Sequence, residues 1–259
     1  MRVPVKAVLV LVLAVGLTGC SSGTRDASPA RPSTAASESA PPPGAACPSR
    51  VTTGKPVRFG SDGATNLGGV VFGTGRTGIV LAHQTEDNLC QWAPYAVELA
   101  RRGYRVLAFD FPGFGFSSDV VSGQTLDGVV VAAAALLRSQ GATAIVLIGA
   151  SMGGTASLVA ATEVQPPVAG VISVSGPTLY QNVAASLAAP KLTVPVLYAA
   201  GRADDEFARD AQTLYDATPA SVDRKLVIVA AGLHGVDLVA DGSEVEAAVT
   251  AFLSAHAPA

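Results

Sequence analysis

Aromatic and charged residues are both scarce in this chain. Aromatic residues make up 5% of the 259 positions and charged residues 14%, whereas apolar residues make up 49%. The formal net charge is −3, and no basic run is interleaved with aromatic residues, which argues against nucleic acid as a partner. The few histidines and cysteines lack the spacing of metal ligands, so we expect neither a metal nor an organic cofactor.

Long apolar runs are also lacking. The one near the start covers residues 7–17, follows Arg2 and Lys6, and is too short for a permanent membrane span. It ends in Leu17-Thr18-Gly19-Cys20, which resembles the lipobox of bacterial lipoproteins. The resemblance implies a signal peptide over residues 1–19, cleavage before Cys20 and lipid attachment to its sulfur. We therefore expect an exported protein anchored to the outer face of a bacterial cell membrane. An ordinary signal peptide is the alternative.

The next segment has few bulky residues. Residues 20–50 are rich in Ser, Ala and Pro, and such a composition buries too little apolar surface to fold. We interpret this segment as a tether and residues 51–259 as a single domain. Cys47 and Cys90 are the remaining cysteines, and an oxidising compartment favours a disulfide between them over two free thiols.

The rest of the chain alternates between strand and helix patterns. This alternation predicts an α/β fold with a mostly parallel sheet of seven or eight strands between helices. Strands are predicted at 56–60, 68–72, 78–83, 105–109, 144–150, 168–174, 195–200 and 225–230, with a turn at 61–63. Helices are predicted at 92–102, 125–140, 155–163, 205–217 and 243–255.

The strand at 144–150 runs directly into a Gly-x-Ser-x-Gly motif at residues 149–153, and a helix pattern follows. Strand, sharp turn and helix in this order are what a nucleophile elbow requires, with Ser151 at its tip. The backbone N–H of Met152 then lies at a helix N-terminus, where it can stabilise a developing oxyanion.

A serine nucleophile needs a base, and the base needs a carboxylate to fix its tautomer. His234 follows the last predicted strand on a loop and is the preferred base, because His256 lies near the chain end and His83 precedes the motif. Asp204 follows the strand at 195–200 and is the preferred acid. Its neighbour Asp205 is the main alternative.

The chain order Ser151, Asp204, His234 resembles that of α/β-hydrolases. Residues 80–84 are similar to the strand and His-Gly turn of that family, and residues 110–117 to its Asp-x-x-Gly-x-Gly-x-Ser loop. The resemblance implies that the second oxyanion donor is the backbone N–H of Thr85 and that His83 is structural. The chain departs from the family at Gln84, where glycine is usual.

The segment available for a lid, residues 176–193, has room for one short helix near 179–188, so we expect an open site. Phe111, Phe114 and Phe116 are candidates for an acyl pocket, with simple packing as the alternative. The resemblance, to esterases and dienelactone hydrolases, implies a serine hydrolase that acts on small-molecule or lipid esters. A thioesterase, acyltransferase or peptidase on the same scaffold, or a lipoprotein that only binds a ligand, is the alternative.

Overall fold

The computed structural model describes residues 47, 53–60, 66–119, 123–240 and 242–259. The expected signal peptide, Cys20 and the turn at 61–63 lie outside the described residues, as does the tether apart from Cys47. The described residues belong to one compact unit. The expected domain start at residue 51 stays a prediction. None of the helices in the described ranges is long and apolar enough to cross a membrane.

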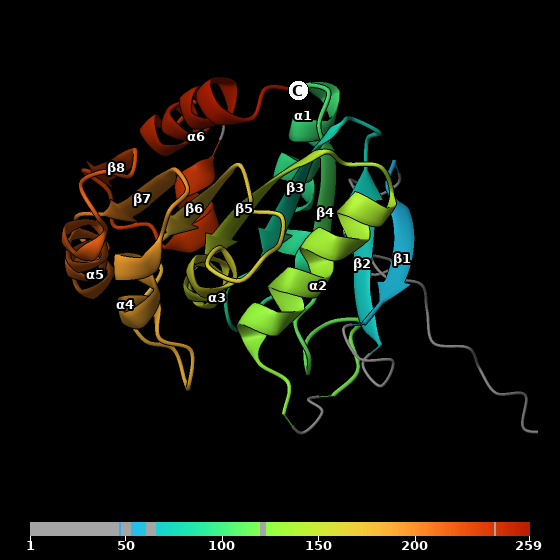
Figure 1. Ribbon diagram of the computed structural model, residues 1–259, viewed down its shortest axis with the longest axis horizontal. Helices are drawn as coiled ribbons and strands as arrows, with labels where there is room; N and C mark the ends of the chain where they lie inside the picture. Colours follow the sequence, from blue (N-terminus) through green and yellow to red (C-terminus); the bar gives the residue numbers. More distant parts are fainter. Residues whose placement is uncertain (1–46, 48–52, 61–65, 120–122, 241) are drawn as a thin grey trace, which may run out of the picture. The chain divides into compact units, whose positions relative to one another are not determined.

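The centre of the fold is an eight-stranded sheet with the order β1-β2-β4-β3-β5-β6-β7-β8 (Figure 1). Strand β2 pairs antiparallel with β1 and β4, and every other pairing in this order is parallel. The predicted, mostly parallel sheet is therefore confirmed. The strands are β1 (Lys55–Phe59), β2 (Leu67–Phe72), β3 (Thr77–Ala82), β4 (Arg105–Phe109), β5 (Ala144–Ala150), β6 (Gly170–Val174), β7 (Val196–Gly201) and β8 (Arg224–Val229).

Helices cover both faces of the sheet. Helices α1 (Ala93–Arg101) and α6 (Glu244–His256) pack on one face. The other face carries α2 (Leu126–Ser139), α3 (Met152–Ala160), α4 (Ala185–Ala188) and α5 (Asp205–Ala217). In the described ranges three short 3₁₀ helices lie in loops: η2 (Leu89–Gln91), η3 (Ala189–Lys191) and η4 (Gly235–Val239).

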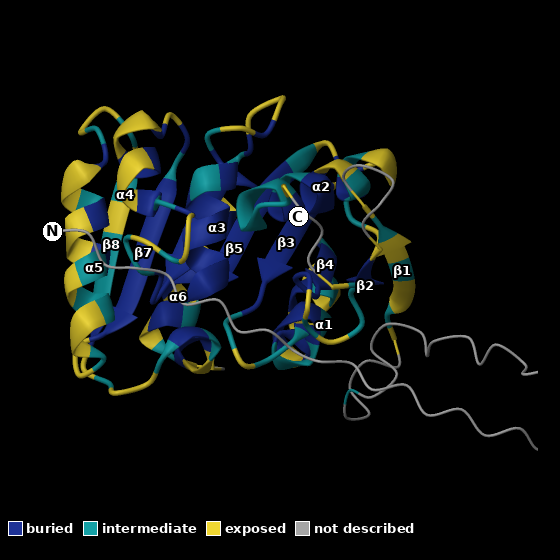
Figure 2. Ribbon diagram, turned by 90° about the horizontal axis from the view of Figure 1, so that it is seen from below, coloured by how far each residue is buried: buried dark blue, intermediate teal, exposed yellow. Residues whose placement is uncertain are grey.

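Burial follows the position of each strand in the sheet. Strands β2, β3, β6 and β7 are buried along their whole length, whereas the edge strands β1 and β8 are partly exposed (Figure 2). Parallel strands covered by helices on both faces need apolar side chains throughout, which explains their continuous Val, Ile, Leu and Ala runs. An apolar sheet covered in this way forms a rigid platform for the loops at its edges.

Two helices differ from the sequence prediction by more than one residue at an end. Helix α3 begins at Met152, directly after Ser151, and not at residue 155. The short helix expected near 179–188 covers only Ala185–Ala188, because Tyr180 and Val183 exchange backbone hydrogen bonds in a tight turn before it. The chain between β6 and β7 is therefore a small hairpin-like turn followed by α4 and the adjoining 3₁₀ turn η3, and it forms no long lid.

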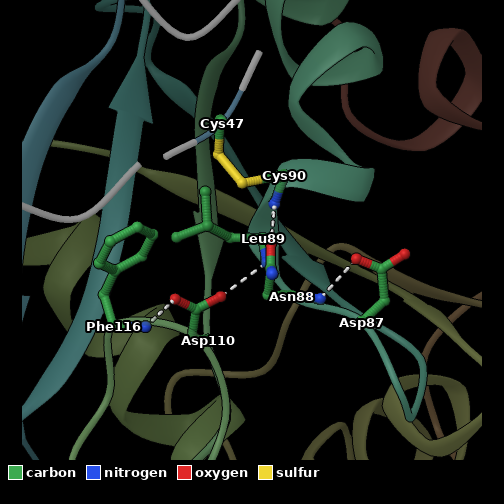
Figure 3. Close-up of a disulfide and its surroundings, with 7 residues drawn as sticks. All are labelled: Cys47, Asp87, Asn88, Leu89, Cys90, Asp110 and Phe116. Atoms are coloured by element: carbon green, nitrogen blue, oxygen red, sulfur yellow. Dashed lines mark hydrogen bonds between the residues drawn. A yellow bond between two sulfur atoms is a disulfide. The ribbon is translucent and has the colours of Figure 1, made fainter. Parts of the chain in front are cut away.

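The loop between β3 and α1 is held by a disulfide between Cys47 and Cys90, whose Cα atoms lie 5.2 Å apart (Figure 3). Asn88 caps η2 by accepting a hydrogen bond from the Cys90 N–H at 2.9 Å. The buried Asp110 carboxylate accepts hydrogen bonds from the N–H groups of Leu89, at 2.6 Å, and Phe116, at 2.7 Å. The predicted disulfide is thus present and fixes the start of the domain to this loop.

Candidate active site

Six neighbouring parallel strands, β4, β3, β5, β6, β7 and β8, end at the same edge of the sheet. In the register of the sheet, Ala82 at the end of β3 lies beside Gly149, and Ala150 at the end of β5 lies beside Val174. Gly201 and Val229 are paired in the same way at the ends of β7 and β8. The loops that follow these strands therefore meet, and they carry all the residues that the sequence singles out for chemistry.

Ser151 occupies the junction between β5 and α3. Its φ of 48° and ψ of −118° lie in a region that L residues seldom adopt, and its backbone N–H donates to the Val174 carbonyl at 2.8 Å. Such a strained backbone costs about 1–3 kcal/mol and persists where the surrounding structure enforces it. The turn has the strand-turn-helix form predicted for a nucleophile elbow.

Close packing explains the second glycine of the motif. A Cβ at Gly153 would collide with the carbonyl oxygens of Ala82 and His83. The first turn of α3 therefore lies directly against the end of β3. The first helical hydrogen bond of α3 runs from the Thr155 N–H to the Ser151 carbonyl at 3.1 Å. The N–H of Met152 precedes that bond, at the positive end of the helix dipole.

His234 and Asp204 form a close polar contact at this edge. The Nδ1 atom of His234 lies 2.7 Å from Oδ2 of Asp204, and the ring of Phe207 packs edge-on against the imidazole at 4.3 Å between centroids. An ionised carboxylate only accepts hydrogen bonds, so Nδ1 carries the proton and Nε2 of the neutral ring has a free lone pair.

Asp205, the alternative acid, is placed differently. Its side chain is 78% exposed and pairs with Arg209 at 3.1 Å, one turn along α5. Asp204 is the N-cap residue of α5, but its side chain makes no capping hydrogen bond. The geometry therefore joins Asp204, and not Asp205, to His234.

The loop that carries His234 packs beside the serine. A Cβ built on Gly235 would lie 3.4 Å from the Cβ of Ala150, the residue that precedes Ser151. Within the described ranges no hydrogen bond joins the Ser151 hydroxyl to the His234 ring. Such contacts are often long in proteins without substrate and shorten when substrate binds. The structure thus brings the loops of all three predicted residues together.

His83 has a structural environment. Its Nε2 accepts a hydrogen bond from the Phe111 N–H at 3.0 Å, and its Nδ1 lies 2.7 Å from the Gln84 carbonyl oxygen. Burial lowers the pKa of His83 to about 4, although the hydrogen bond to Gln84 opposes this shift. The ring is therefore neutral, with its proton on Nδ1, and it fixes the backbone at the start of the loop after β3.

The same contact orients Thr85. The peptide bond between Gln84 and Thr85 is trans, so the Thr85 N–H points away from the carbonyl that faces His83. The hydroxyl of Tyr180 donates to Oγ1 of Thr85 at 3.3 Å. The Gln84 side chain extends from this loop toward the loop after β8, where its Oε1 accepts a hydrogen bond from the Val236 N–H at 3.1 Å.

Sequence analysis did not identify three residues that contact the predicted site residues or their loops. Ser175 accepts a hydrogen bond from the Gly235 N–H at 3.1 Å, while Phe207 and Tyr180 contact the His234 ring and Thr85. Ser175 directly follows a buried strand, and a polar residue at the end of a parallel strand could have been predicted to lie near the site. Nothing in the sequence marks the other two.

The three phenylalanines of the loop after β4 mainly pack against the structure. Phe111 is fully buried, and the rings of Phe111 and Phe114 each lie edge-on against His83, with centroids 5.1 Å apart. Phe116 packs against the core beneath α1 and α6 and donates its N–H to Asp110.

In the ranges that the structure describes, no group of three or more His, Cys, Asp or Glu side chains is arranged to hold a metal ion.

Comparison with known proteins agrees with this architecture. Residues 77–193 match the model of a family described as alpha/beta hydrolase fold. Together with the sheet order and the elbow, this match shows that the chain has the α/β-hydrolase fold. No curated protein sequence matches the chain significantly.

Solved structures with the same fold include hydrolases. An esterase from Pyrococcus furiosus superimposes with a TM-score of 0.68 at 18% identity, over 78% of this chain and 90% of that one. A monoacylglycerol lipase from Paleococcus ferrophilus gives 0.62 at 17% identity, over 74% and 99%. An esterase from a Rhodococcus species gives 0.63 at 18% identity, over 78% and 99%.

Proposed function

We propose that this protein is a serine hydrolase that cleaves carboxylic esters. Ser151 is the nucleophile, His234 the general base and Asp204 the residue that orients the base. The observation that carries the proposal is the 2.7 Å contact between His234 and Asp204 on loops adjacent to the strained Ser151 turn. A serine presented on a strained turn beside a carboxylate-bound imidazole has few structural explanations and a direct chemical one.

The reaction follows from the protonation state of the imidazole. The Ser151 Oγ attacks the carbonyl carbon while its proton passes to Nε2 of His234. The tetrahedral intermediate then collapses, and His234 returns this proton to the leaving alkoxide. A water molecule, deprotonated by His234, then attacks the acyl-serine, and when the second tetrahedral intermediate collapses His234 returns the water's proton to the Ser151 Oγ, which releases the carboxylic acid and restores the free serine. The Asp204 carboxylate stabilises the imidazolium in both halves of the reaction.

The oxyanion of each tetrahedral intermediate needs two donors. The Met152 N–H, at the start of α3, supplies one. The Thr85 N–H supplies the other, and its direction is fixed by the hydrogen bond between His83 and the Gln84 carbonyl. Backbone donors are fixed before the substrate arrives, so they cost little reorganisation during the reaction.

The choice of esters has two supports. The proteins of similar structure include two esterases and a monoacylglycerol lipase. The segment between β6 and β7 contains only the short helices α4 and η3 and no long lid helix, which fits a site that admits extended esters. We therefore propose small-molecule or lipid esters as substrates.

We also propose that the protein is exported and anchored by a lipid on Cys20. The Leu17-Thr18-Gly19-Cys20 segment and the disulfide between Cys47 and Cys90 support this location, because disulfides persist in oxidising compartments. Labelled palmitate supplied to cells should be incorporated into the wild-type protein and not into a Cys20→Ala variant, and equal labelling of the two, or no labelling of the wild type, would contradict the anchor.

Hydrolysis of p-nitrophenyl esters of graded chain length tests the proposed activity. Ser151→Ala is expected to lower kcat by about 10⁶-fold with an unchanged Tm, because no other group replaces the nucleophile. Ser254→Ala, at an exposed position of α6, is the matched control and should retain full activity. Near wild-type turnover by folded Ser151→Ala would contradict the assignment.

A further inference from the structure

The two backbone N–H groups that follow His234 both donate to side chains from loops that follow other strands. The Gly235 N–H donates to Oγ of Ser175 at 3.1 Å, and the Val236 N–H donates to Oε1 of Gln84 at 3.1 Å. We propose that Gln84 and Ser175 are positioning residues that hold the His234 loop in its working geometry. This inference rests on the proposed function, since it assigns His234 the role of base.

The start of η4 explains why this loop needs outside acceptors. The first N–H groups of a helical turn have no partner within it, and the residue at the N-cap usually supplies one from its own side chain. His234 occupies the N-cap of η4, but its side chain makes no capping bond because the imidazole is bound to Asp204. Ser175 and Gln84 therefore take over the capping that His234 cannot perform.

Gln84 also connects this loop to the proposed oxyanion donor. Its carbonyl oxygen lies 2.7 Å from Nδ1 of His83, and this contact sets the direction of the Thr85 N–H. Its side chain meanwhile binds the Val236 N–H. One residue thus ties the oxyanion donor to the loop of the base, and a displacement on one side would be passed to the other.

The glycine after His234 is matched to the Gln84 side chain. Gly235 has a φ of 57°, and a Cβ at this position would collide with Oε1 and approach Cδ of Gln84 at 3.1 Å. The amide therefore fills the space that a side chain at position 235 would need. The departure from glycine at position 84 is thus matched by a glycine at position 235.

Ser175 contributes from the other side of the loop. It is fully buried, and its φ of 51° is unusual for a residue other than glycine. Its own N–H donates to the Ala199 carbonyl at 2.7 Å, which fixes the residue between β6 and β7. Such a conformation is costly for serine, so its presence here indicates that the Gly235 N–H needs the Ser175 hydroxyl as its acceptor.

Kinetics on p-nitrophenyl esters test the catalytic consequence. Gln84→Met keeps the size of the side chain but removes the acceptor. It should lower kcat by about 10- to 100-fold with KM changed less than about threefold, because a base displaced by about 1 Å slows chemistry without removing substrate contacts. Gln140→Met, at an exposed position after α2, is the matched control and should behave as wild type.

A double-mutant cycle tests the contact itself. Gly235→Ala should lower kcat in the wild-type background, because the new methyl group displaces the amide and also strains the backbone at a φ of 57°. In a Gln84→Ala background only the backbone strain remains, so the same change should cost about tenfold less. Equal losses in the two backgrounds, or wild-type kcat in Gln84→Met, would overturn the proposal. If Gln84→Met does not fold, Gly235→Ala still probes the contact without altering residue 84.

Hydrogen–deuterium exchange separates this inference from the proposed activity. The segment 230–239 should exchange faster in Gln84→Met than in Gln140→Met, whether or not the wild-type protein hydrolyses the test esters. Equal exchange in the two variants would overturn the proposal that Gln84 positions the His234 loop. An inactive wild-type protein in which Gln84→Met still speeds exchange would contradict the proposed function but support the positioning of the loop by Gln84.

Discussion

The loops after β3 and after β8 lie at the same edge of the sheet and each contains one histidine, but they hold it in opposite ways. His83 is fully buried, and both of its ring nitrogens face backbone groups. The side chain of His234 is 31% exposed, and its Nδ1 faces a carboxylate. A backbone partner fixes a ring in place, whereas a carboxylate partner also stabilises the charge that proton transfer creates.

The two loops also differ in how their backbones are fixed. A disulfide at Cys90, the Asn88 cap and the buried Asp110 carboxylate anchor the loop after β3. The loop after β8 is held by hydrogen bonds to the side chains of Gln84 and Ser175, by the contact between His234 and Asp204, and by a backbone bond from the Ala203 N–H to the Ala231 carbonyl. The first loop resembles a rigid frame, while the second is positioned by side chains that one substitution can remove.

The largest effect that tests this comparison is expected at the carboxylate partner of His234. Asp204→Asn should lower kcat by about 10⁴-fold, because an amide no longer fixes the reactive tautomer or stabilises the imidazolium. Asp205→Asn is the neighbouring control and should change kcat little, since Asp205 faces solvent and pairs with Arg209. Steady-state kinetics on an ester measure both variants, and the reverse ranking would show that the contact at 2.7 Å is not the working one.

The next effect concerns the frame of the loop after β3. Replacing Cys47 and Cys90 together with serine should lower the free energy of unfolding by about 4 kcal/mol, because the disulfide closes a loop with a sequence separation of 43. Urea denaturation measures this loss. At temperatures where the variant is folded, kcat should remain close to that of wild type. A large loss of kcat without a loss of stability would mean that the frame acts on the chemistry directly.

The smallest effect is the pH dependence of the free energy of unfolding, which distinguishes the buried side chains of His83 and Asp110. Burial lowers the pKa of His83 to about 4. The unfolded chain therefore takes up a proton first as pH falls below about 6.5, and stability falls between pH 6.5 and 4 by about 3 kcal/mol. Burial raises the pKa of Asp110 to about 6, although the hydrogen bonds from Phe116 and Leu89 oppose this. The folded chain then holds this proton more tightly, and stability rises by about 3 kcal/mol as pH falls from 6 to 4.

These two slopes oppose each other in the wild-type protein, so each should be visible only when the other group is replaced. His83→Gln keeps an acceptor for the Phe111 N–H and should gain stability relative to wild type as pH falls from 6.5 to 4. Asp110→Asn should lose stability over the same range. Urea denaturation at several pH values gives the slopes, and parallel curves for wild type and both variants would contradict the assigned environments.

Local sequence patterns were sufficient for much of the fold. The strand over 105–109 and the helix over 205–217 have the bounds predicted from apolar runs and helical spacing. The strand-turn-helix around Ser151 followed from its glycines and the apolar run before them. These features depend on neighbours in the chain, and for this reason the sequence alone reveals them.

Long-range contacts were not accessible in the same way. Gln84 and Val236 are 152 positions apart, and no local pattern pairs them. The choice between Asp204 and Asp205 depended on the first turn of α5, which points one side chain inward and the other outward. The short helix near 179–188 was overestimated because the turn between Tyr180 and Val183 satisfies backbone groups that a longer helix would have bound.

Covalent labelling tests the central claim most directly. A fluorophosphonate probe reacts with a serine only when a neighbouring base activates it, and peptide mass spectrometry locates the adduct. We expect one adduct, on the peptide that contains Ser151, in the folded wild-type protein and almost none in a folded His234→Ala variant. An unlabelled wild-type protein, an adduct on a different residue, or equal labelling of the His234→Ala variant would contradict the account.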